Sequence, residues 1–109
     1  MCAAGNLVRL EISDNPLTEE VAPALAACLA AQPNLVHLNL NDTSLTDEGV
    51  QEVCKALVGA APQLEVLELA LNEITPVGAR AVAKAVANKQ HLNKCALTIV
   101  VAKFLQTVS

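Results

Sequence analysis

Aliphatic residues recur along the chain at the same places in a unit of 28 or 29 residues. Each unit opens with a leucine, and two further apolar positions follow it at fixed offsets. In the first three units these residues are Leu7, Leu10 and Ile12, then Leu35, Leu38 and Leu40, then Leu64, Leu67 and Leu69. The units start at residues 7, 35, 64 and 92, so the spacings are 28 (35−7), 29 (64−35) and 28 (92−64) residues. This period predicts a solenoid of stacked units, which presents a surface for binding rather than an enzymatic pocket.

The start of each unit predicts a short strand. In the second unit Leu38 and Leu40 alternate with polar residues, which is typical of a half-buried strand. His37, Asn39 and Asn41 then face the opposite side of the sheet. The same assignment places on this side Arg9, Glu11 and Ser13 from the first unit, Val66, Glu68 and Ala70 from the third, and Lys94, Ala96 and Thr98 from the fourth. We expect these residues to line the concave surface of a parallel sheet.

The end of each strand motif carries a residue suited to bonding with the backbone. Asn15 and Asn72 hold this position in the first and third units, and a buried asparagine there can satisfy backbone groups freed as the chain turns. Thr43 holds it in the second unit. Because a hydroxyl can bond to fewer groups than an amide, we expect a weaker ladder of hydrogen bonds at Thr43.

A helix is predicted after each turn. The expected N-caps are Thr18 before Glu19 and Glu20, Thr46 before Asp47 and Glu48, and Thr75 before Pro76. The expected inward faces are Ala22, Leu25, Ala26 and Leu29, then Val50, Val53, Cys54 and Leu57, then Ala79, Val82, Ala83 and Val86. Pro23 lies beyond the positions that tolerate a missing N–H, so the first helix should start late or kink.

These elements predict an α/β fold, a right-handed strand–helix solenoid of about four repeats in a single domain that spans residues 1–109. The last repeat departs from the pattern. A helix segment that recurs at 53–57, 82–86 and 101–105 begins 18 residues after the first leucine of units two and three, but only 9 after Leu92. We therefore expect a truncated, irregular fourth unit. Because neither end has a polar capping unit, the open edges favour self-association.

Composition narrows the range of partners. The net charge is −4, the pI is near 5.0 and Phe104 is the single aromatic residue. With no Lys/Arg cluster along the sequence and no series of aromatic residues for base stacking, nucleic acid is not an expected ligand. The acidic balance fits a basic protein partner, although a modest negative charge more often serves only solubility.

The cysteines and the apolar segments indicate a cytoplasmic protein. Cys2, Cys28, Cys54 and Cys95 form no C-x-x-C pair and have no histidine at ligand spacing, so we expect no metal site. Core packing in a reducing compartment is the expected role of the last three. The start of the chain does not resemble a signal peptide, and the longest apolar segment is too short to span a membrane, so no membrane insertion is expected.

Catalytic motifs are missing from the sequence. There is no H-E-x-x-H, no G-x-S-x-G, no Gly-rich phosphate loop and no Cys/His nucleophile pattern. His37 and His91 have no evident partner that would make either of them a base. We therefore expect a binding module without its own catalytic machinery and without a cofactor.

The unit pattern resembles the ribonuclease-inhibitor type of leucine-rich repeat over nearly all of the chain. Segments 10–25, 38–50 and 64–75 resemble the Ran GTPase-activating proteins, particularly the plant members. The resemblance implies binding of GTP-bound Ran and stimulation of GTP hydrolysis without an arginine finger, in nucleocytoplasmic transport. It also implies a cytoplasmic protein, with nuclear-envelope association in the full-length form. Earlier repeats of that family, an amino-terminal targeting domain of its plant members and an acidic tail have no counterpart here.

In that family the contacts lie at the strand-to-helix edge and on the nearby concave face. The resemblance therefore implies a partner-binding strip made of Glu11, Asp14, Asn41, Asp42, Glu68 and Glu73. Alternatively, each of these residues is an ordinary solvent-exposed residue at the rim of a loop and binds no partner. At the level of function, the alternative is a noncatalytic scaffold like the repeats of cytosolic immune receptors or ribonuclease inhibitors.

Overall fold

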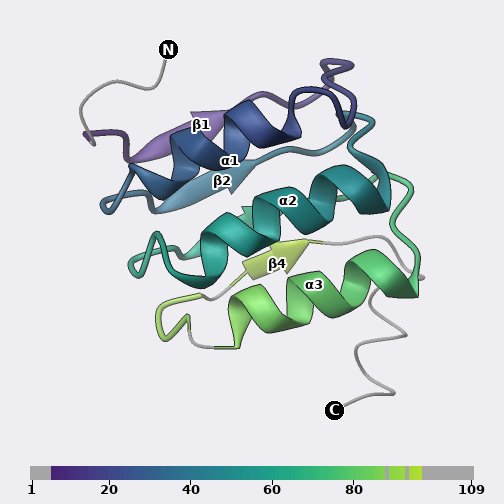
Figure 1. The fold of residues 1–109 in the computed structure, drawn as a ribbon. Coiled ribbons are helices and arrows are strands. Elements are labelled where there is room, and N and C mark those ends of the chain that lie inside the picture. The colour runs from purple at the N-terminus through teal and green to yellow at the C-terminus, as the bar shows by residue number, and fades with distance from the viewer. Residues whose placement is uncertain (1–5, 88, 93, 97–109) are drawn as a thin grey trace.

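The computed structural model describes residues 6–87, 89–92 and 94–96, and strands alternate with helices along them. The strands are β1 (Arg9–Glu11), β2 (His37–Asn39), β3 (Val66–Glu68) and β4 (Lys94–Ala96). The helices are α1 (Ala22–Ala30), α2 (Thr46–Val58) and α3 (Pro76–Val86). The strands pair in parallel in the order β1-β2-β3-β4, and the helices cover one face of this sheet (Figure 1). The predicted α/β solenoid is confirmed over this part of the chain.

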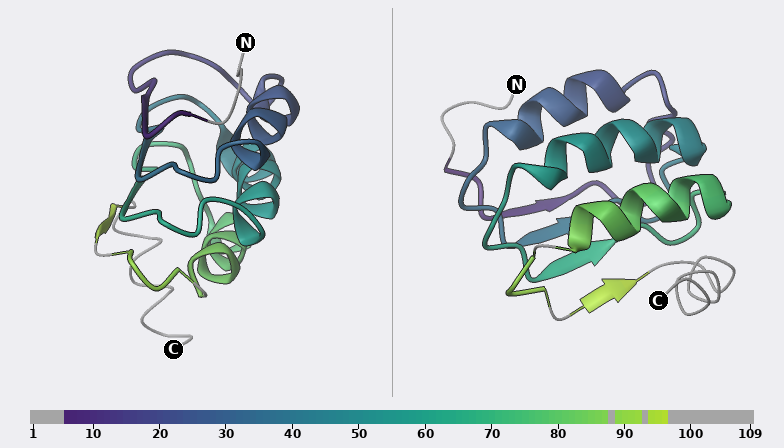
Figure 2. Two further views of the ribbon diagram at one scale, coloured as in Figure 1. Left: turned by 90° about the vertical axis from the view of Figure 1, so that its left-hand side faces the viewer. Right: turned by 60° about the horizontal axis from the view of Figure 1, so that its bottom comes forward.

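The strand register confirms the repeat spacing read from the sequence. Leu10 pairs with Leu38, and Leu38 pairs with Leu67. The neighbouring polar rows run from Arg9 to His37 and from Glu11 through Asn39 to Glu68. Figure 2 shows the resulting two layers, with the helices stacked side by side above the sheet. The face of the sheet away from the helices therefore carries the polar rows.

The core lies between the two layers and is built from aliphatic side chains. The six repeat leucines of the second and third units are fully buried, namely Leu35, Leu38, Leu40, Leu64, Leu67 and Leu69. Leu7, Leu10 and Ile12 of the first unit are only partly buried. The inward helix faces are close to those predicted, although Cys28 is buried in α1 where Ala26 was expected, and Ala85 is buried in α3 where Ala83 and Val86 were expected.

The predicted helix caps are correct only for α3. The Thr75 hydroxyl accepts the backbone N–H of Val77 at 3.3 Å, and Pro76 opens the helix. The prediction for Thr46 is wrong, because this residue lies within α2 and its hydroxyl donates to the Leu45 carbonyl. The prediction for Thr18 is also wrong, because its hydroxyl stabilises a turn by accepting the N–H of Glu20 at 3.3 Å.

The start of α1 is late, as the position of Pro23 predicted. The helix begins at Ala22, so Pro23 falls in the first turn, where its missing N–H leaves no helical hydrogen bond unmade. The N-cap residue Val21 makes no capping hydrogen bond through its side chain.

Polar side chains also join neighbouring repeats at the helix ends. Asp47 of α2 accepts the N–H groups of Thr75 and Gly78 at 2.8 and 3.1 Å, so it caps α3 from the preceding repeat. Lys89 donates from Nζ to the carbonyl of Ala60 at 2.6 Å and to that of Leu57, at the end of α2. Burial lowers the pKa of Lys89 below its usual value. The Asp47 contacts satisfy N–H groups at the start of α3, and the Lys89 contacts add a charged donor to carbonyls at the end of α2 and just after it.

Some predictions concern residues outside the described range. These are the irregular remainder of the fourth unit and the missing cap at residues 1–5.

Cys54 is a buried free thiol, as predicted. Cys28 is buried and disulfide-bonded, so its assignment as a reduced core residue is wrong. The helices described here include none with the length and apolar character needed to cross a membrane.

Candidate functional site

His37 lies between two carboxylates on the face of the sheet opposite the helices. Its Nε2 is 3.6 Å from Oε2 of Glu11 on β1 and 3.5 Å from Oε2 of Glu68 on β3. This nitrogen is buried and makes no hydrogen bond within the described residues, although 15% of the side chain is exposed. His37 therefore lies within ion-pair distance of carboxylates on both neighbouring strands.

The Glu11 carboxylate is held charged by its neighbours. Arg9, two residues earlier on β1, donates from Nη2 to Oε2 of Glu11 at 3.0 Å. This hydrogen bond is the largest influence on the pKa of Glu11 and lowers it below the usual 4.5, partly opposed by desolvation and assisted by the charges of Arg9 and His37. Glu11 therefore stays ionised at neutral pH and presents a negative charge on the concave face.

Asn41 links the ends of β2 and β3. Its Nδ2 donates to Oε1 of Glu68 at 3.3 Å, and its Oδ1 accepts the backbone N–H of Ala70 at 2.8 Å. The Asn39 side chain in turn accepts the N–H of Asn41 at 3.0 Å. Of the predicted site residues, Glu11 and Glu68 therefore flank His37, and Asn41 joins them through its hydrogen bond to Glu68. We call these four residues the inner group.

The other three predicted site residues form an exposed rim. Asp14, Asp42 and Glu73 lie in the turns between strands and helices, with left-handed backbone φ values of 63°, 54° and 56°. The backbone N–H of Asp14 donates to the Asn41 carbonyl at 3.0 Å, which stacks the turns of the first two units. No hydrogen bond or ion pair joins the rim carboxylates to the inner group in the described part of the chain. The predicted strip is therefore two groups, an inner one and a rim.

Asn72 supports the turn beneath the rim. It is fully buried, and its Oδ1 accepts the N–H groups of Thr43 and Leu45 at 3.0 and 3.1 Å. The prediction of a buried asparagine is thus confirmed for Asn72 and wrong for Asn15, which is exposed and donates to the carbonyls of Ile12 and Ser13. The side-chain hydrogen bonds of Thr43 go to Leu40 and Asn72 and do not reach the turn of the first unit, which fits the predicted weakening of the ladder.

The roles of His37 and Asp47 were not predicted from the sequence. In the sequence His37 stands apart from Glu11 and Glu68, which are far from it along the chain. The strand register brings the three residues close together. The position of Asp47, one repeat before Thr75 and Pro76, was a usable signal for a cap across repeats.

The inner group and the rim together are suited to recognising a charged partner. Over the described residues, no group of three or more His, Cys, Asp or Glu side chains is placed to hold a metal ion.

Comparison with known proteins agrees with this architecture. A leucine-rich repeat family model matches residues 31–54 and 61–83, and a second model of the same description matches residues 6–28. RAN GTPase-activating protein 2 of Arabidopsis thaliana is 37% identical over 81 residues, which are 74% of this chain and 15% of that protein.

Two other similar proteins have names that mention no GTPase. NACHT, LRR and PYD domains-containing protein 3 of Bos taurus is 39% identical over 59% of this chain, and Protein CARMIL of Dictyostelium discoideum is 33% identical over 76% of it. The matched parts are 6% and 8% of those proteins, so the chain spans a small part of each relative. Because the repeat models cover three successive units and the strands and helices follow the same period, the chain belongs to the leucine-rich repeat family.

Proposed function

We propose that this chain is a protein-interaction module that binds a Ran-like small GTPase in its GTP-bound form and stimulates GTP hydrolysis. The observation that carries the proposal is the inner group beside an acidic rim, in which Glu11 and Glu68 flank His37 and Asn41 bonds to Glu68. The similarity to RAN GTPase-activating protein 2 supports the choice of partner.

In this proposal the catalytic groups belong to the GTPase. Phosphoryl transfer depends mainly on positioning and on electrostatic stabilisation, so an activator can act by ordering the switch segments of its partner. The acidic rim of Asp14, Asp42 and Glu73 would attract a basic surface of the GTPase and speed the encounter. Glu11 and Glu68 would then contact basic side chains at closer range. The chain itself would contribute neither a nucleophile nor a cofactor.

A single-turnover assay tests this function. Ran is loaded with GTP, the chain is added in excess, and phosphate release is followed over time. Faster release than with Ran alone supports activation, whereas an unchanged rate combined with measurable binding supports a scaffold. If the chain neither binds Ran nor stimulates its GTP hydrolysis, the proposal is overturned.

Charge variants test the surface. Glu11→Gln with Glu68→Gln removes two carboxylates of the inner group, and Asp14→Asn with Asp42→Asn removes two from the rim while keeping side chains that tolerate a left-handed backbone. Both pairs should weaken association, mainly through the on-rate and more at about 50 mM than at about 300 mM salt. The matched control is Glu48→Gln with Glu65→Gln, which removes two exposed carboxylates outside both groups. Equal effects of all three pairs would remove the site assignment.

A noncatalytic scaffold is the second candidate function. Its support is that NACHT, LRR and PYD domains-containing protein 3 and Protein CARMIL, which are also similar to this chain, have names that mention no GTPase. A scaffold would use the same concave face, but it would leave the hydrolysis rate of a bound GTPase unchanged. The single-turnover assay therefore separates the two candidates.

Two finer points accompany the proposal. A module acting on a Ran-like GTPase would work in the cytoplasm, and at the nuclear envelope as part of a longer protein. For the architecture, we propose right-handed crossovers, as in nearly all parallel strand–helix–strand units, and about four repeats in all.

A further inference from the structure

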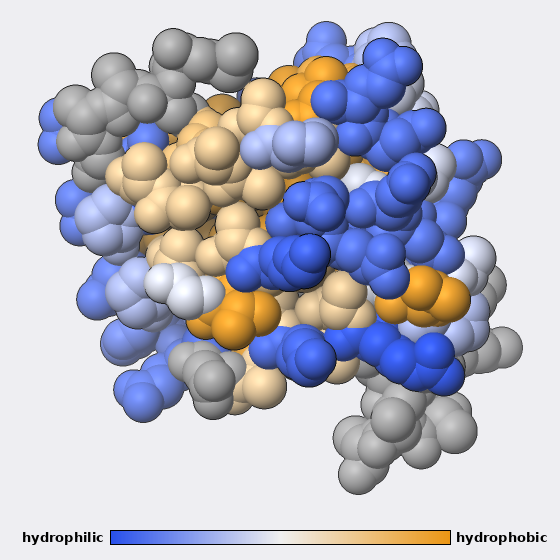
Figure 3. Space-filling model, in the orientation of Figure 1, coloured by the Kyte–Doolittle hydropathy of each residue, from blue (hydrophilic) through white to orange (hydrophobic). Residues whose placement is uncertain are grey.

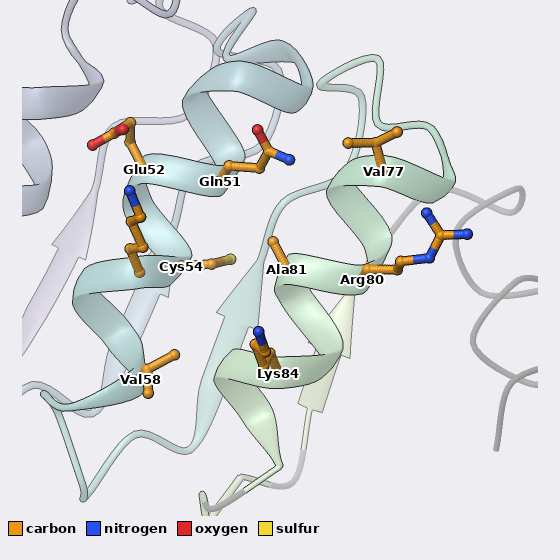
Figure 4. A pocket seen from close by; sticks show the side chains of 9 residues that line it. Gln51, Glu52, Cys54, Val58, Val77, Arg80, Ala81 and Lys84 are labelled. Carbon is orange, nitrogen blue, oxygen red and sulfur yellow. The ribbon is translucent and has the colours of Figure 1, made fainter.

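A groove lies between α2 and α3 on the helix-covered face, away from the inner group and the rim. It has a volume of about 630 Å³ and is lined by side chains from both helices (Figure 4). Because α3 has 11 residues, the groove can extend for about 16 Å, which corresponds to about three turns of a helix laid along it.

Basic side chains gather along this groove. Lys55 of α2 and Arg80 and Lys84 of α3 are three of the seven Lys and Arg residues in a chain that has eleven acidic residues. Lys55 and Lys84 hold the same position in consecutive repeats, 29 residues apart (84−55), and both line the groove. All three are exposed, and within the described residues neither lysine forms an ion pair. The sequence showed no basic cluster because Lys55 lies one repeat before Arg80 and Lys84.

The same groove offers apolar contacts. Val58 and Val77 lie toward its opposite ends, with 46% and 48% of their surface exposed (Figure 4). Ala81 lies between them on α3, and its small side chain leaves room in the middle of the groove for a side chain of a partner. Glu52 is the one acidic residue of the lining. The groove therefore combines apolar side chains with a net positive charge.

The neighbouring helix shows that this charge is specific to the groove. Residues 21–36, which include α1, contain no charged side chain, and the exposed positions of α1 are alanines and a proline. Figure 3 shows the contrast, with mostly pale orange surface over α1 and more blue surface over α2 and α3. A partner attracted only by apolar surface would therefore bind α1, whereas an acidic partner would bind between α2 and α3.

We propose that the groove between α2 and α3 docks an acidic amphipathic helix of a protein partner. Its apolar side chains would pack on Val58, Val77 and Ala81, and its carboxylates would pair with Lys55, Arg80 and Lys84. Packing an amphipathic helix along a groove is a general mode of peptide recognition. This site is separate from the concave face, so one chain could hold a second protein while its concave face is occupied.

The lining favours an acidic protein segment over other anionic ligands. The groove has no aromatic side chain on which a nucleic-acid base could stack. Three cations with Glu52 among them make a weak attraction for an anionic membrane, and the exposed valines are too few to insert into one. An acidic helix uses both the apolar and the basic part of the lining.

The test uses two stapled, fluorescein-labelled helical peptides of about 14 residues. Both carry the same leucine face, and one carries glutamates at its flanks where the other carries lysines. Anisotropy should show binding of the acidic peptide and at least about tenfold weaker binding of the basic one. The proposal fails if the two peptides bind equally, if the acidic peptide does not bind at about 1 mM, or if oligo-dT or anionic phosphatidylserine vesicles bind more tightly than the acidic peptide.

Variants assign the binding to the groove. Lys55→Glu with Lys84→Glu should weaken binding of the acidic peptide by about tenfold or more, and Lys84→Glu alone should weaken it by about threefold. The control for the single variant is Gln63→Glu with Gln90→Glu, which changes the net charge by the same two units at exposed positions away from the groove. Equal weakening by this control would show an effect of net charge alone and would overturn the proposal.

Amide shifts in two-dimensional NMR spectra show where the peptide binds. The acidic peptide should shift the amides of α2 and α3, and the double lysine variant should keep its thermal unfolding midpoint while it loses these shifts. Shifts confined to α1 or to the strands of the concave face would overturn the assignment. Because the readout is peptide binding, failure here leaves the GTPase assay and its outcome unaffected.

Discussion

The side-chain oxygen Oδ1 of Asn72, at the end of the third strand motif, accepts the backbone N–H of Thr43 in the preceding repeat at 3.0 Å. The same oxygen accepts the N–H of Leu45 at 3.1 Å, and Nδ2 of Asn72 donates to the carbonyl of Leu40 at 2.7 Å. One buried amide therefore satisfies several backbone groups of the previous turn. Neighbouring repeats are joined by directed hydrogen bonds as well as by apolar packing.

Replacing Asn72 by alanine should destabilise the fold strongly. The substitution leaves the buried backbone groups of Thr43, Leu45 and Leu40 without these partners, and the expected loss is about 3 kcal/mol in the free energy of unfolding. Urea unfolding followed by circular dichroism measures it. Asn15→Ala is the matched control, because Asn15 holds the same motif position but is exposed, so its loss should be under about 1 kcal/mol. Equal losses would contradict the role given to Asn72.

Asp47→Ala should destabilise α3, although Asp47 belongs to α2. The carboxylate accepts the N–H groups of Thr75 and Gly78 at the start of α3, so its removal should cost about 1 kcal/mol, as for an N-cap residue. Hydrogen exchange should accelerate at the first turn of α3 more than within α2. Glu48→Ala, at the exposed neighbouring position, is the control and should leave this turn protected.

Gly78→Ala should also destabilise the chain, even though alanine is the better helix former. A Cβ atom at Gly78 would overlap Oδ1 of Asp47 and lie 2.9 Å from Cγ2 of Ile74, so it would displace the cap. We expect a loss of about 1 to 2 kcal/mol in thermal or urea unfolding. Gly59→Ala is the contrasting variant, since no atom lies within 4 Å of its Cβ position, and it should be neutral or stabilising by about 0.5 kcal/mol. The opposite order of the two variants would contradict this packing.

The strand positions, which depend on the repeat period, were predicted correctly from the sequence. The helix caps, which depend on the neighbouring backbone groups, were predicted less well. The row Leu10, Leu38 and Leu67 follows from alternation within each unit and from the spacing between units, and the structure confirms it. The caps at Thr18 and Thr46 were wrong because a threonine hydroxyl can bond to several nearby backbone groups, and composition does not decide among them.

The candidate site shows the same limit. Alternation correctly placed Glu11, Asn41 and Glu68 on the concave face, but it could not show that His37 lies between the two carboxylates. That contact depends on side-chain direction across three strands. The exposed rim residues followed from their position in the turns, whereas their left-handed backbone follows from the stacking of one turn on the next.

Arg9→Ala should raise the pKa of Glu11, because the Arg9 hydrogen bond is the main cause of its lowered value. In the native protein the side-chain carboxyl of Glu11 should titrate below 4.5 in carbon-13 NMR, and in Arg9→Ala its midpoint should move up toward 4.5. A folded pKa below the unfolded one means that the ionised carboxylate stabilises the fold above about pH 4.5, and that this contribution disappears as pH falls through the folded pKa. The native chain should therefore lose stability more steeply below pH 4.5 than the variant does. Arg9→Lys, which keeps the charge, should give an intermediate midpoint, and a midpoint unchanged in both variants would exclude Arg9 as the cause.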